Sequence, residues 1–319
     1  MTARGAGRLG VLGAVSKIAW PVGEPYNAPV HLFLPLISAL LYVGGALFLK
    51  QATLHGVGVW RTTFVANLIC AVLFAGLWPL GGELQPASTW WQPAVVAFLF
   101  LAGQALSFLA IEHGDVSVAT PVMGVKVLMV AAFSTVVIGE AVPLTLWLAA
   151  ASASAGIAFL NRRPDQAAKG RVGLTIMLAM TAAAAYAMFD VLVQKWSPAW
   201  GAGRFLPVML AFVAVYSLGL IPFFHSPLRA IAPAAWRPLL CGAILIAAQG
   251  LILITTLSLF GDATAVNVVY GSRGFWSVLA VWWLGHWFAN TEGTAGGRVL
   301  GSRLTGAVLL TGAIVLLFL

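Results

Sequence analysis

Two basic residues lie within apolar segments of this sequence and are the first candidates for chemistry. Lys126 ends the segment "GDVSVATPVMGVK" (residues 114–126), and Arg273 ends "GDATAVNVVYGSR" (residues 261–273). The two segments align without a gap at an offset of 147 residues, so the two cations occupy matching positions. A charge near the middle of a membrane-spanning helix costs about 3 kcal/mol or more unless it is paired, hydrated or snorkels to the surface. The matching cations therefore predict either a shared anion-binding site or two structural residues that snorkel or form ion pairs.

The composition places these residues in a membrane. The chain has 319 residues, of which 61% are hydrophobic and only 8% are charged, and its mean hydropathy is +0.97. Soluble domains carry about 25% charged residues, so we predict an integral membrane protein. The net charge of +8 comes from Lys and Arg scattered over short segments, which does not predict a nucleic-acid partner. Cys70 and Cys241 both fall in apolar stretches and predict neither a disulfide nor a metal site.

The apolar stretches have the length of membrane-spanning helices, which need about 20 residues each. The strict alternation typical of β-barrel strands is absent from the sequence. Ten stretches can be marked: residues 30–49, 57–80, 92–111, 117–138, 143–160, 172–194, 204–223, 238–260, 264–287 and 303–319. The sequence therefore predicts ten transmembrane helices.

A polar break at residues 161–171 divides the chain into two halves. We expect a tail over residues 1–29, a first five-helix repeat over 30–160, a linker loop over 161–171 and a second five-helix repeat over 172–319. An odd number of helices per repeat means that the second repeat enters the membrane from the opposite side. The predicted fold is an all-α integral membrane protein whose ten helices form two inverted repeats, with a site between them at the midplane. Further matching landmarks are Tyr42 with Tyr186, Gln104 with Gln249, Arg61 with Arg204, and Pro79 with Pro222.

The chain resembles EamA-type members of the drug/metabolite transporter superfamily. The resemblance lies in "GDVSVATPVMGVK…IGEAVPLTLWLAAASASAGIAFL", and it weakens in the second half, where "GHW" (residues 285–287) replaces "IGE" (residues 138–140). It implies a secondary transporter. Superfamily members that move sugar nucleotides and triose phosphates also place basic residues in the fourth and ninth helices, where Lys126 and Arg273 fall. The resemblance also implies cytoplasmic termini, whereas the distribution of Lys and Arg favours external ones, so the orientation stays open.

Polar residues near the two cations complete the predicted site. Tyr270 lies three residues before Arg273 and therefore on the same helix face. For each neighbour the alternative is an interhelical hydrogen bond. Asp190 is the one acidic residue that we place inside a span, where it is a candidate for proton coupling or for a local ion pair with Lys195. The predicted substrate-binding residues are Lys126, Arg273, Tyr270, Tyr42, Tyr186, Gln249, Gln104 and Asn267.

The predicted function is secondary transport of a small anionic metabolite by alternating access. The main alternative is a flippase for a phosphate-bearing, lipid-linked substrate. An enzyme is less favoured, because the sequence has no nucleophile elbow and no histidine spacing for a metal. A scaffold is less favoured, because an inverted repeat with central charges favours transport, and the absence of a P-loop argues against ATP as the driver. We therefore expect no cofactor and no metal. The expected partners are the substrate and the lipid bilayer, with a homodimer as an alternative to the monomer. The expected location is the bacterial inner (cytoplasmic) membrane.

Overall fold

The computed structural model describes residues 29–112, 116–139, 141–161, 172–284 and 297–318, and every regular element in these ranges is a helix. Within them, seven helices have the length and hydropathy needed to cross a membrane, and residues 144–160 and 301–316 form shorter apolar helices. An all-helical membrane protein is therefore confirmed, whereas the count of ten spans stays a prediction. The predicted tail and linker lie almost wholly outside the described residues.

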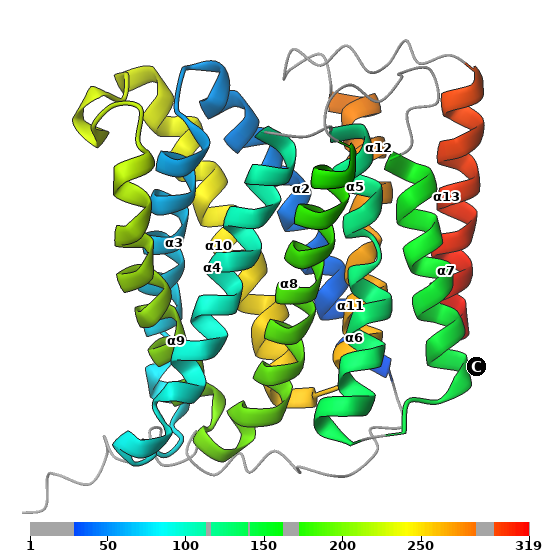
Figure 1. Cartoon of the computed structure of the whole chain (residues 1–319), viewed down its shortest axis with the longest axis horizontal. Coiled ribbons are helices and arrows are strands. Elements are labelled where there is room, and N and C mark those ends of the chain that lie inside the picture. The colour runs from blue at the N-terminus through cyan, green and yellow to red at the C-terminus, as the bar shows by residue number, and fades with distance from the viewer. Residues whose placement is uncertain (1–28, 113–115, 140, 162–171, 285–296, 319) are drawn as a thin grey trace, which may run out of the picture.

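The helices stand side by side as a bundle (Figure 1). Helix α2 begins and helix α13 ends toward the same, lower end of the bundle in this view. The α-helices are α2 (Phe33–Leu54), α3 (Val59–Ala75), α4 (Trp91–Glu112), α5 (Val116–Met123), α6 (Lys126–Phe133), α7 (Leu144–Asn161), α8 (Val172–Trp200), α9 (Ala202–Ser217), α10 (Pro233–Phe260), α11 (Ala263–Gly271), α12 (Arg273–Leu284) and α13 (Gly297–Leu316). Short 3-10 helices are η1 (Pro29–Leu32), η2 (Trp78–Leu80), η3 (Ala87–Thr89), η5 (Leu218–Phe223) and η6 (Leu228–Ala230), and a π-helix, η4 (Ser134–Ile138), follows α6.

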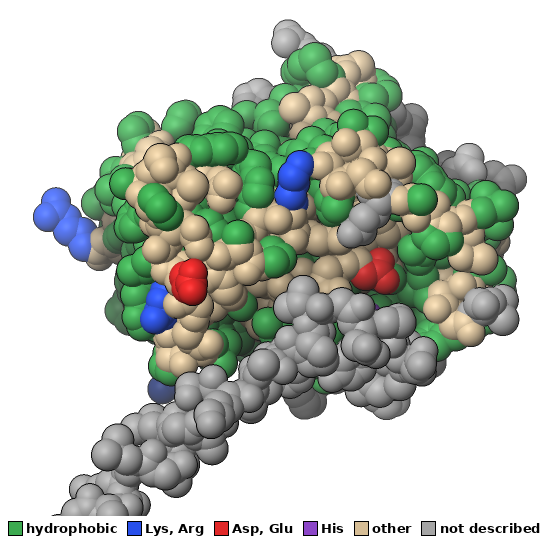
Figure 2. Space-filling model, turned by 90° about the horizontal axis from the view of Figure 1, so that it is seen from below, with side chains coloured by type: hydrophobic (Ala, Val, Ile, Leu, Met, Phe, Trp, Pro, Cys, Tyr) green, Lys and Arg blue, Asp and Glu red, His purple; other side chains and the backbone are tan. Residues whose placement is uncertain are grey.

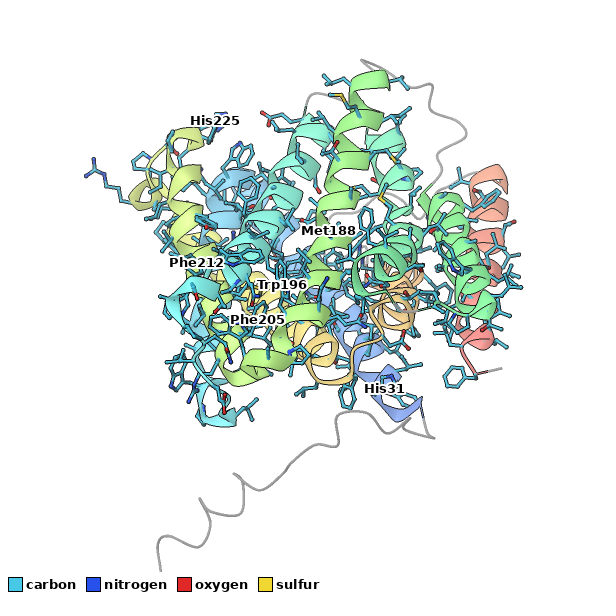
Figure 3. The ribbon with its side chains drawn as sticks, turned by 60° about the horizontal axis from the view of Figure 1, so that its bottom comes forward. His31, Met188, Trp196, Phe205, Phe212 and His225 are labelled. Atoms are coloured by element: carbon cyan, nitrogen blue, oxygen red, sulfur yellow. The ribbon has the colours of Figure 1, made fainter. Side chains whose placement is uncertain are left out.

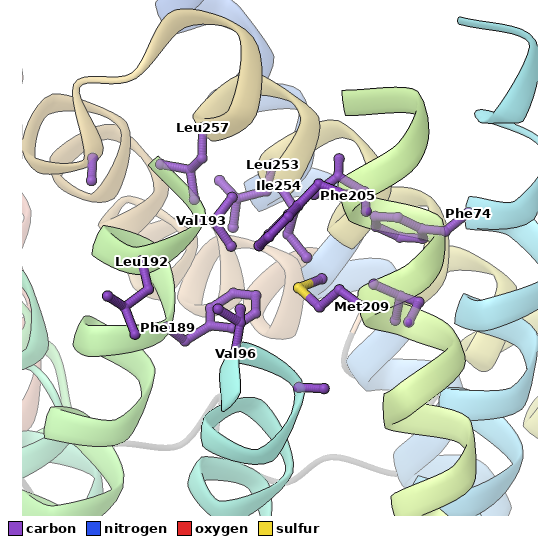
Figure 4. Packing of buried hydrophobic residues seen from close by; sticks show 14 of the residues in the cluster. Phe74, Val96, Phe189, Leu192, Val193, Phe205, Met209, Leu253, Ile254 and Leu257 are labelled. Carbon is purple, nitrogen blue, oxygen red and sulfur yellow. The ribbon is translucent and has the colours of Figure 1, made fainter. Parts of the chain in front are cut away.

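Helices from the two halves of the chain pack against each other in a crossed pattern. Helix α2 lies along α10, and α8 lies along α4. Helices α3 and α9 adjoin at one edge of the bundle, and α7 and α13 adjoin at the other. The largest apolar core lies among α4, α8, α9 and α10, where Phe189, Phe205 and Met209 meet (Figure 4). Seen from below, the end of the bundle shows few charged side chains among the described residues (Figure 2).

Two of the predicted spans are broken near their middles. The predicted span 117–138 is split into α5 and α6 by a turn at Gly124 and Val125, and the predicted span 264–287 is split into α11 and α12 at Ser272. Pro121 lies in the last turn of α5 and has no backbone N–H to donate. The Gly124 and Val125 amides instead close short turns onto the carbonyls of Pro121 and Val122, at 3.0 and 3.1 Å. Neither break was predicted from the sequence, although residues 118–138 together still have the length and hydropathy needed to cross a membrane.

Glycine at each break allows close packing against one residue of α7. A Cβ atom on Gly124 would lie 2.9 Å from Ile157 Cγ2, and one on Gly271 would lie 3.3 Å from Ile157 Cδ1. Both distances are shorter than an ordinary carbon–carbon contact. Asp262 caps α11, because its carboxylate accepts a hydrogen bond from the Ala265 amide at 3.1 Å. Asp115, which aligns with Asp262 at the offset of 147, lies outside the described residues.

Candidate functional site

Each break in a helix starts the next segment with a cation. Lys126 is the first residue of α6, and Arg273 is the first residue of α12. Their side chains therefore project from interrupted backbone rather than from continuous helices, which is the arrangement typical of binding sites in transporters.

Lys126 forms a buried ion pair with Asp190 of α8. The distance from Lys126 Nζ to Asp190 Oδ2 is 2.7 Å, and the side chains are 15% and 3% exposed. The expected alternative, an ion pair between Asp190 and Lys195, is not what the structure shows. Lys195 instead donates a hydrogen bond to the Val137 carbonyl at 2.6 Å. The charge of Lys126 is thus balanced by a carboxylate from the other half of the chain.

Asn267 of α11 joins the same pair. Its side-chain nitrogen donates to Asp190 Oδ2 at 2.8 Å and to the Ala263 carbonyl at 2.9 Å. Asp190 therefore receives hydrogen bonds from α6 and from α11, which lie in different halves of the chain. A buried carboxylate with a charged and a neutral donor has its polar atoms well satisfied.

Arg273 has a different environment. Its guanidinium carbon lies 4.3 Å from the centroid of the Tyr270 ring and 5.0 Å from that of Tyr42. Among the described residues, no carboxylate lies within the 4.0 Å that defines a salt bridge to Arg273. Aromatic faces attract a guanidinium but do not neutralise it. Arg273 therefore keeps its positive charge, with N–H donors for a planar anion.

A hydrogen bond to Gln249 holds the Tyr270 ring beside Arg273. The Tyr270 hydroxyl donates to Gln249 Oε1 at 2.9 Å. The single hydroxyl hydrogen of Ser38 can reach the same oxygen, at 3.1 Å, or the Gln249 backbone carbonyl, at 2.9 Å. The rings of Tyr42 and Tyr270 meet edge to face at 6.2 Å. Ser38 was not predicted, although it lies four residues before Tyr42 and so on the same face of α2.

Tyr186 takes the matching position beside Lys126. Lys126 Nζ lies 5.8 Å from the centroid of the Tyr186 ring, which also meets the edge of Phe100 at 6.3 Å. Tyr186 belongs to the second half and faces the cation of the first, whereas Tyr42 belongs to the first half and faces the cation of the second. The two cation–tyrosine pairs are therefore crossed between the halves.

Gln104 belongs to a separate polar cluster. Its side-chain amide exchanges two hydrogen bonds with that of Asn67, at 3.0 and 3.1 Å, and Asn67 also donates to Ser217 Oγ at 2.9 Å. These contacts join α3, α4 and α9 and fit the interhelical hydrogen bond that was the alternative for Gln104. The other seven predicted residues lie, with Asp190, in two groups, one around the Lys126–Asp190 pair and one around Arg273. No cluster of metal-binding side chains occurs in the part of the chain that the structure describes.

Comparison with known protein families agrees with the resemblance to EamA-type transporters seen in the sequence. Residues 30–162 match the model of the EamA-like transporter family. The chain is also similar to a solved crystal structure of a protein with a TM-score of 0.74 and 16% sequence identity, over 91% of this chain and 98% of that one. At this identity the likeness concerns the fold alone. A comparison with curated proteins gave no match.

Proposed function

We propose that this chain is a membrane transporter of the drug/metabolite transporter type, the class indicated by the match of residues 30–162 to the EamA-like transporter family, and that it carries a small anionic metabolite by alternating access. The proposal rests chiefly on one observation. The Arg273 guanidinium contacts two tyrosine rings and has no carboxylate partner among the described residues. A planar guanidinium suits a carboxylate or a phosphate, which it can bind through two parallel hydrogen bonds.

The ion pair changes the form of the predicted site. Two free cations were expected, but Lys126 is balanced by Asp190, so Arg273 is the anion-binding group in this proposal. Lys126 and Asp190 border the site, and Tyr42, Tyr186 and Tyr270 supply aromatic surfaces. Gln249 and Asn267 orient these groups through the hydrogen bonds to Tyr270 and Asp190.

Alternating access in this proposal follows from two inverted five-helix repeats. Three observations support such repeats. Helix α2 packs on α10 as α8 packs on α4, the cation–tyrosine pairs are crossed between the halves, and α2 begins at the end of the bundle where α13 finishes. In inverted-repeat transporters, exchange of conformation between the two halves moves access from one side of the membrane to the other.

Asp190 remains the candidate for proton coupling in this proposal. It receives both the Lys126 ammonium and the Asn267 amide, so a proton on Asp190 would remove the charge that holds Lys126. If Asp190→Asn leaves both the rate of anion uptake and its dependence on pH unchanged, Asp190 has only a structural role.

Uptake into proteoliposomes tests the proposal. The probes are radiolabelled small carboxylates and phosphate monoesters, and the variant is Arg273→Gln. Arg237→Gln is the matched control, because Arg237 is an exposed arginine at the start of α10. We expect Arg273→Gln to lose uptake and Arg237→Gln to keep it. Uptake that is equal in both variants contradicts the anion site. Movement of a fluorescent polyprenyl phosphate between leaflets, without uptake of the soluble probes, would instead support the flippase.

Orientation, oligomeric state and the type of membrane are carried forward as predictions. The chain is an integral, multi-pass membrane protein. Labelling of cysteines placed at Thr2 and Asp165 with an impermeant reagent will show which end faces the cytoplasm. The same purified protein will show by mass photometry whether it is a monomer or a homodimer.

A further inference from the structure

The start of α3 and the start of α9 correspond at an offset of 143 residues. Gly58 precedes α3 and Gly201 precedes α9, and the third residues of these helices are Arg61 and Arg204. The segments that follow the two helices also correspond, because "GLWP" (residues 76–79) matches "GLIP" (residues 219–222) at the same offset. The two arginines can therefore be compared as equivalents at opposite ends of the bundle.

Arg204 reaches across to the other half of the chain. Its Nη1 donates to the Trp78 carbonyl at 2.7 Å, and its guanidinium carbon lies 4.3 Å from the centroid of the Trp78 ring. Further hydrogen bonds join the α3–α4 loop to the end of α8. The Glu83 amide donates to the Trp200 carbonyl at 2.8 Å, and Gln85 Nε2 donates to the Ala199 carbonyl at 2.6 Å. We call residues 76–86 and 197–204 together the latch.

Glycines allow the two backbone segments of the latch to approach this closely. A Cβ atom on Gly203 would lie 2.5 Å from the Gly81 carbonyl oxygen, and one on Gly201 would lie 2.8 Å from Gly82 Cα. A Cβ atom on Gly82 would collide with the Trp200 carbonyl oxygen. Gly82 and Gly201 also have positive φ angles of 110° and 75°, which other residues rarely adopt.

Arg61 makes no such crossing at the opposite end. Its Nη2 turns back to its own loop and donates to the Gly56 carbonyl at 2.7 Å, while Nε and Nη1 are buried without a hydrogen-bond partner. The residue is only 5% exposed. Leaving buried donors without a hydrogen bond is costly. In this conformation Arg61 therefore lacks contacts to the other half of the chain like those that Arg204 makes with Trp78.

Aromatic side chains, rather than backbone hydrogen bonds, fill the interface beside Arg61. The rings of Trp60 and Phe223 lie 5.3 Å apart, and those of Phe64 and Phe224 lie 5.6 Å apart. No hydrogen bond joins residues 55–61 to residues 218–231, both of which the structure describes in full. The equivalents of Gly203 and Gly81 are Trp60 and Phe224, so the backbones cannot approach as they do in the latch. Figure 3 labels Phe205, near the start of α9, and His225, beyond its end, which mark the two ends being compared.

We propose that Arg204 and Arg61 are alternating latch residues, one for each end of the bundle. Arg204 closes the latch end in this conformation. When that end opens, Arg61 crosses to the Ile221 carbonyl, which is the equivalent of the Trp78 carbonyl. Because Trp60 and Phe224 stand there in place of Gly203 and Gly81, the second closure is weaker, and the conformation with the latch closed is the more populated one. This inference rests on the alternating access proposed above.

Distances between paired spin labels test the proposal in the full chain. One pair, Leu84→Cys with Pro198→Cys, spans the latch, and the pair at the equivalent positions, Pro227→Cys with His55→Cys, spans the other end. All four positions are exposed, and Cys70 and Cys241 are replaced by Ala in the background. Arg204→Ala and Gly203→Ala each break the latch by an independent route. Gly219→Ala is the control, because a Cβ atom there meets nothing within 4 Å.

Loss of an ordinary hydrogen bond shifts a two-state equilibrium about fivefold to tenfold. We expect each latch variant to raise the long-distance population of the Leu84–Pro198 pair by about that factor and to shorten the Pro227–His55 pair. Arg61→Ala and Gly219→Ala should leave the Leu84–Pro198 pair closed. Distances at the latch that stay unchanged in both folded latch variants, or that lengthen together with those at the other end, overturn the inference.

Anion uptake by the same preparations separates this inference from the proposed function. If Arg273→Gln abolishes uptake while the Leu84–Pro198 distance is unchanged in Arg204→Ala and Gly203→Ala, the anion site is supported and the latch is wrong. If the latch distances respond as expected while no carboxylate or phosphate ester is taken up, the latch stands and the anionic substrate is wrong.

Discussion

Lys126 and Arg273 occupy equivalent places in the two halves, yet their surroundings differ. Each begins the second segment of a broken helix, and each faces a tyrosine from the other half. Lys126 also contacts Asp190 at 2.7 Å, whereas Arg273 has no carboxylate partner in the described part of the chain. The same architecture therefore holds one neutralised cation and one free cation.

A single residue accounts for this difference. Asp190 lies four residues after Tyr186 on α8, and the residue four positions after Tyr42 on α2 is Ala46. At the spacing that relates the two tyrosines, the second half thus carries a carboxylate where the first carries a methyl group. A repeat that was symmetric at this position would pair both cations and leave no charge for an anion.

The largest expected effect comes from breaking the ion pair between Lys126 and Asp190. Lys126→Gln leaves the buried Asp190 without its cation, and removing one partner of a buried ion pair costs about 3–5 kcal/mol of stability. Removing an unpaired lysine from a membrane span should not destabilise the fold, because it relieves a desolvation cost. The ion pair with Asp190 leads to the opposite expectation for Lys126. Thermal unfolding in detergent measures the loss. The double variant Lys126→Gln/Asp190→Asn should recover most of it, and a single variant as stable as the wild type would contradict the pairing.

The second prediction concerns a variant that would give Arg273 a carboxylate partner, as Lys126 has in Asp190. Ala46→Asp places a carboxylate on α2, which packs against α12, the helix that Arg273 begins. If this carboxylate neutralises Arg273, uptake of small carboxylates should fall about tenfold to a hundredfold, the loss expected for one charged hydrogen bond. Ala46→Asn has nearly the same size without the charge and should keep most of the activity. Equal losses in the two variants would indicate crowding rather than charge.

The third prediction concerns the rings that hold Arg273. Tyr42→Leu removes one aromatic face at 5.0 Å from the guanidinium, and cation–π contacts contribute about 0.5–2 kcal/mol. We expect the apparent affinity for the anion to weaken about twofold to thirtyfold. Tyr42→Phe keeps the ring and should bind nearly as the wild type does. Binding measured by isothermal titration will separate the two variants, and a loss in Tyr42→Phe equal to that in Tyr42→Leu would assign the effect to the hydroxyl.

The sequence predicted much of this comparison but not its asymmetry. Composition alone predicted a helical membrane protein, and the gapless alignment of two segments identified Lys126 and Arg273 as equivalents. The pairing of Lys126 with Asp190 could not be predicted, because it depends on α6 lying beside α8 in the folded bundle. Gln104 shows the same limit, since its partner Asn67 lies on a neighbouring helix that no local pattern identifies.

The breaks in the two helices were missed for another reason. Pro121 and Gly124 lie within four residues of each other and could have indicated the first break. The second break has no proline, and the Ser272 amide bonds to the Val269 carbonyl at 3.0 Å within an apolar segment that reads as continuous helix. Hydropathy measures the length of an apolar stretch and is insensitive to a change of one hydrogen bond within it.

The smallest expected effect comes from removing the hydrogen bond between Tyr270, which contacts Arg273, and Gln249. Tyr270→Phe keeps the ring that faces Arg273 and removes the hydroxyl that donates to Gln249 Oε1 at 2.9 Å. The Ser38 hydroxyl, 3.1 Å from that oxygen, can donate to it in place of Tyr270, so the cost should be about 1 kcal/mol or less. Anion affinity should therefore fall no more than about fivefold. Tyr216→Phe is the control, because the Tyr216 ring packs on Phe212 and its hydroxyl forms no hydrogen bond among the described residues. A larger loss in Tyr270→Phe would mean that the hydroxyl contacts the anion directly, in addition to orienting Gln249.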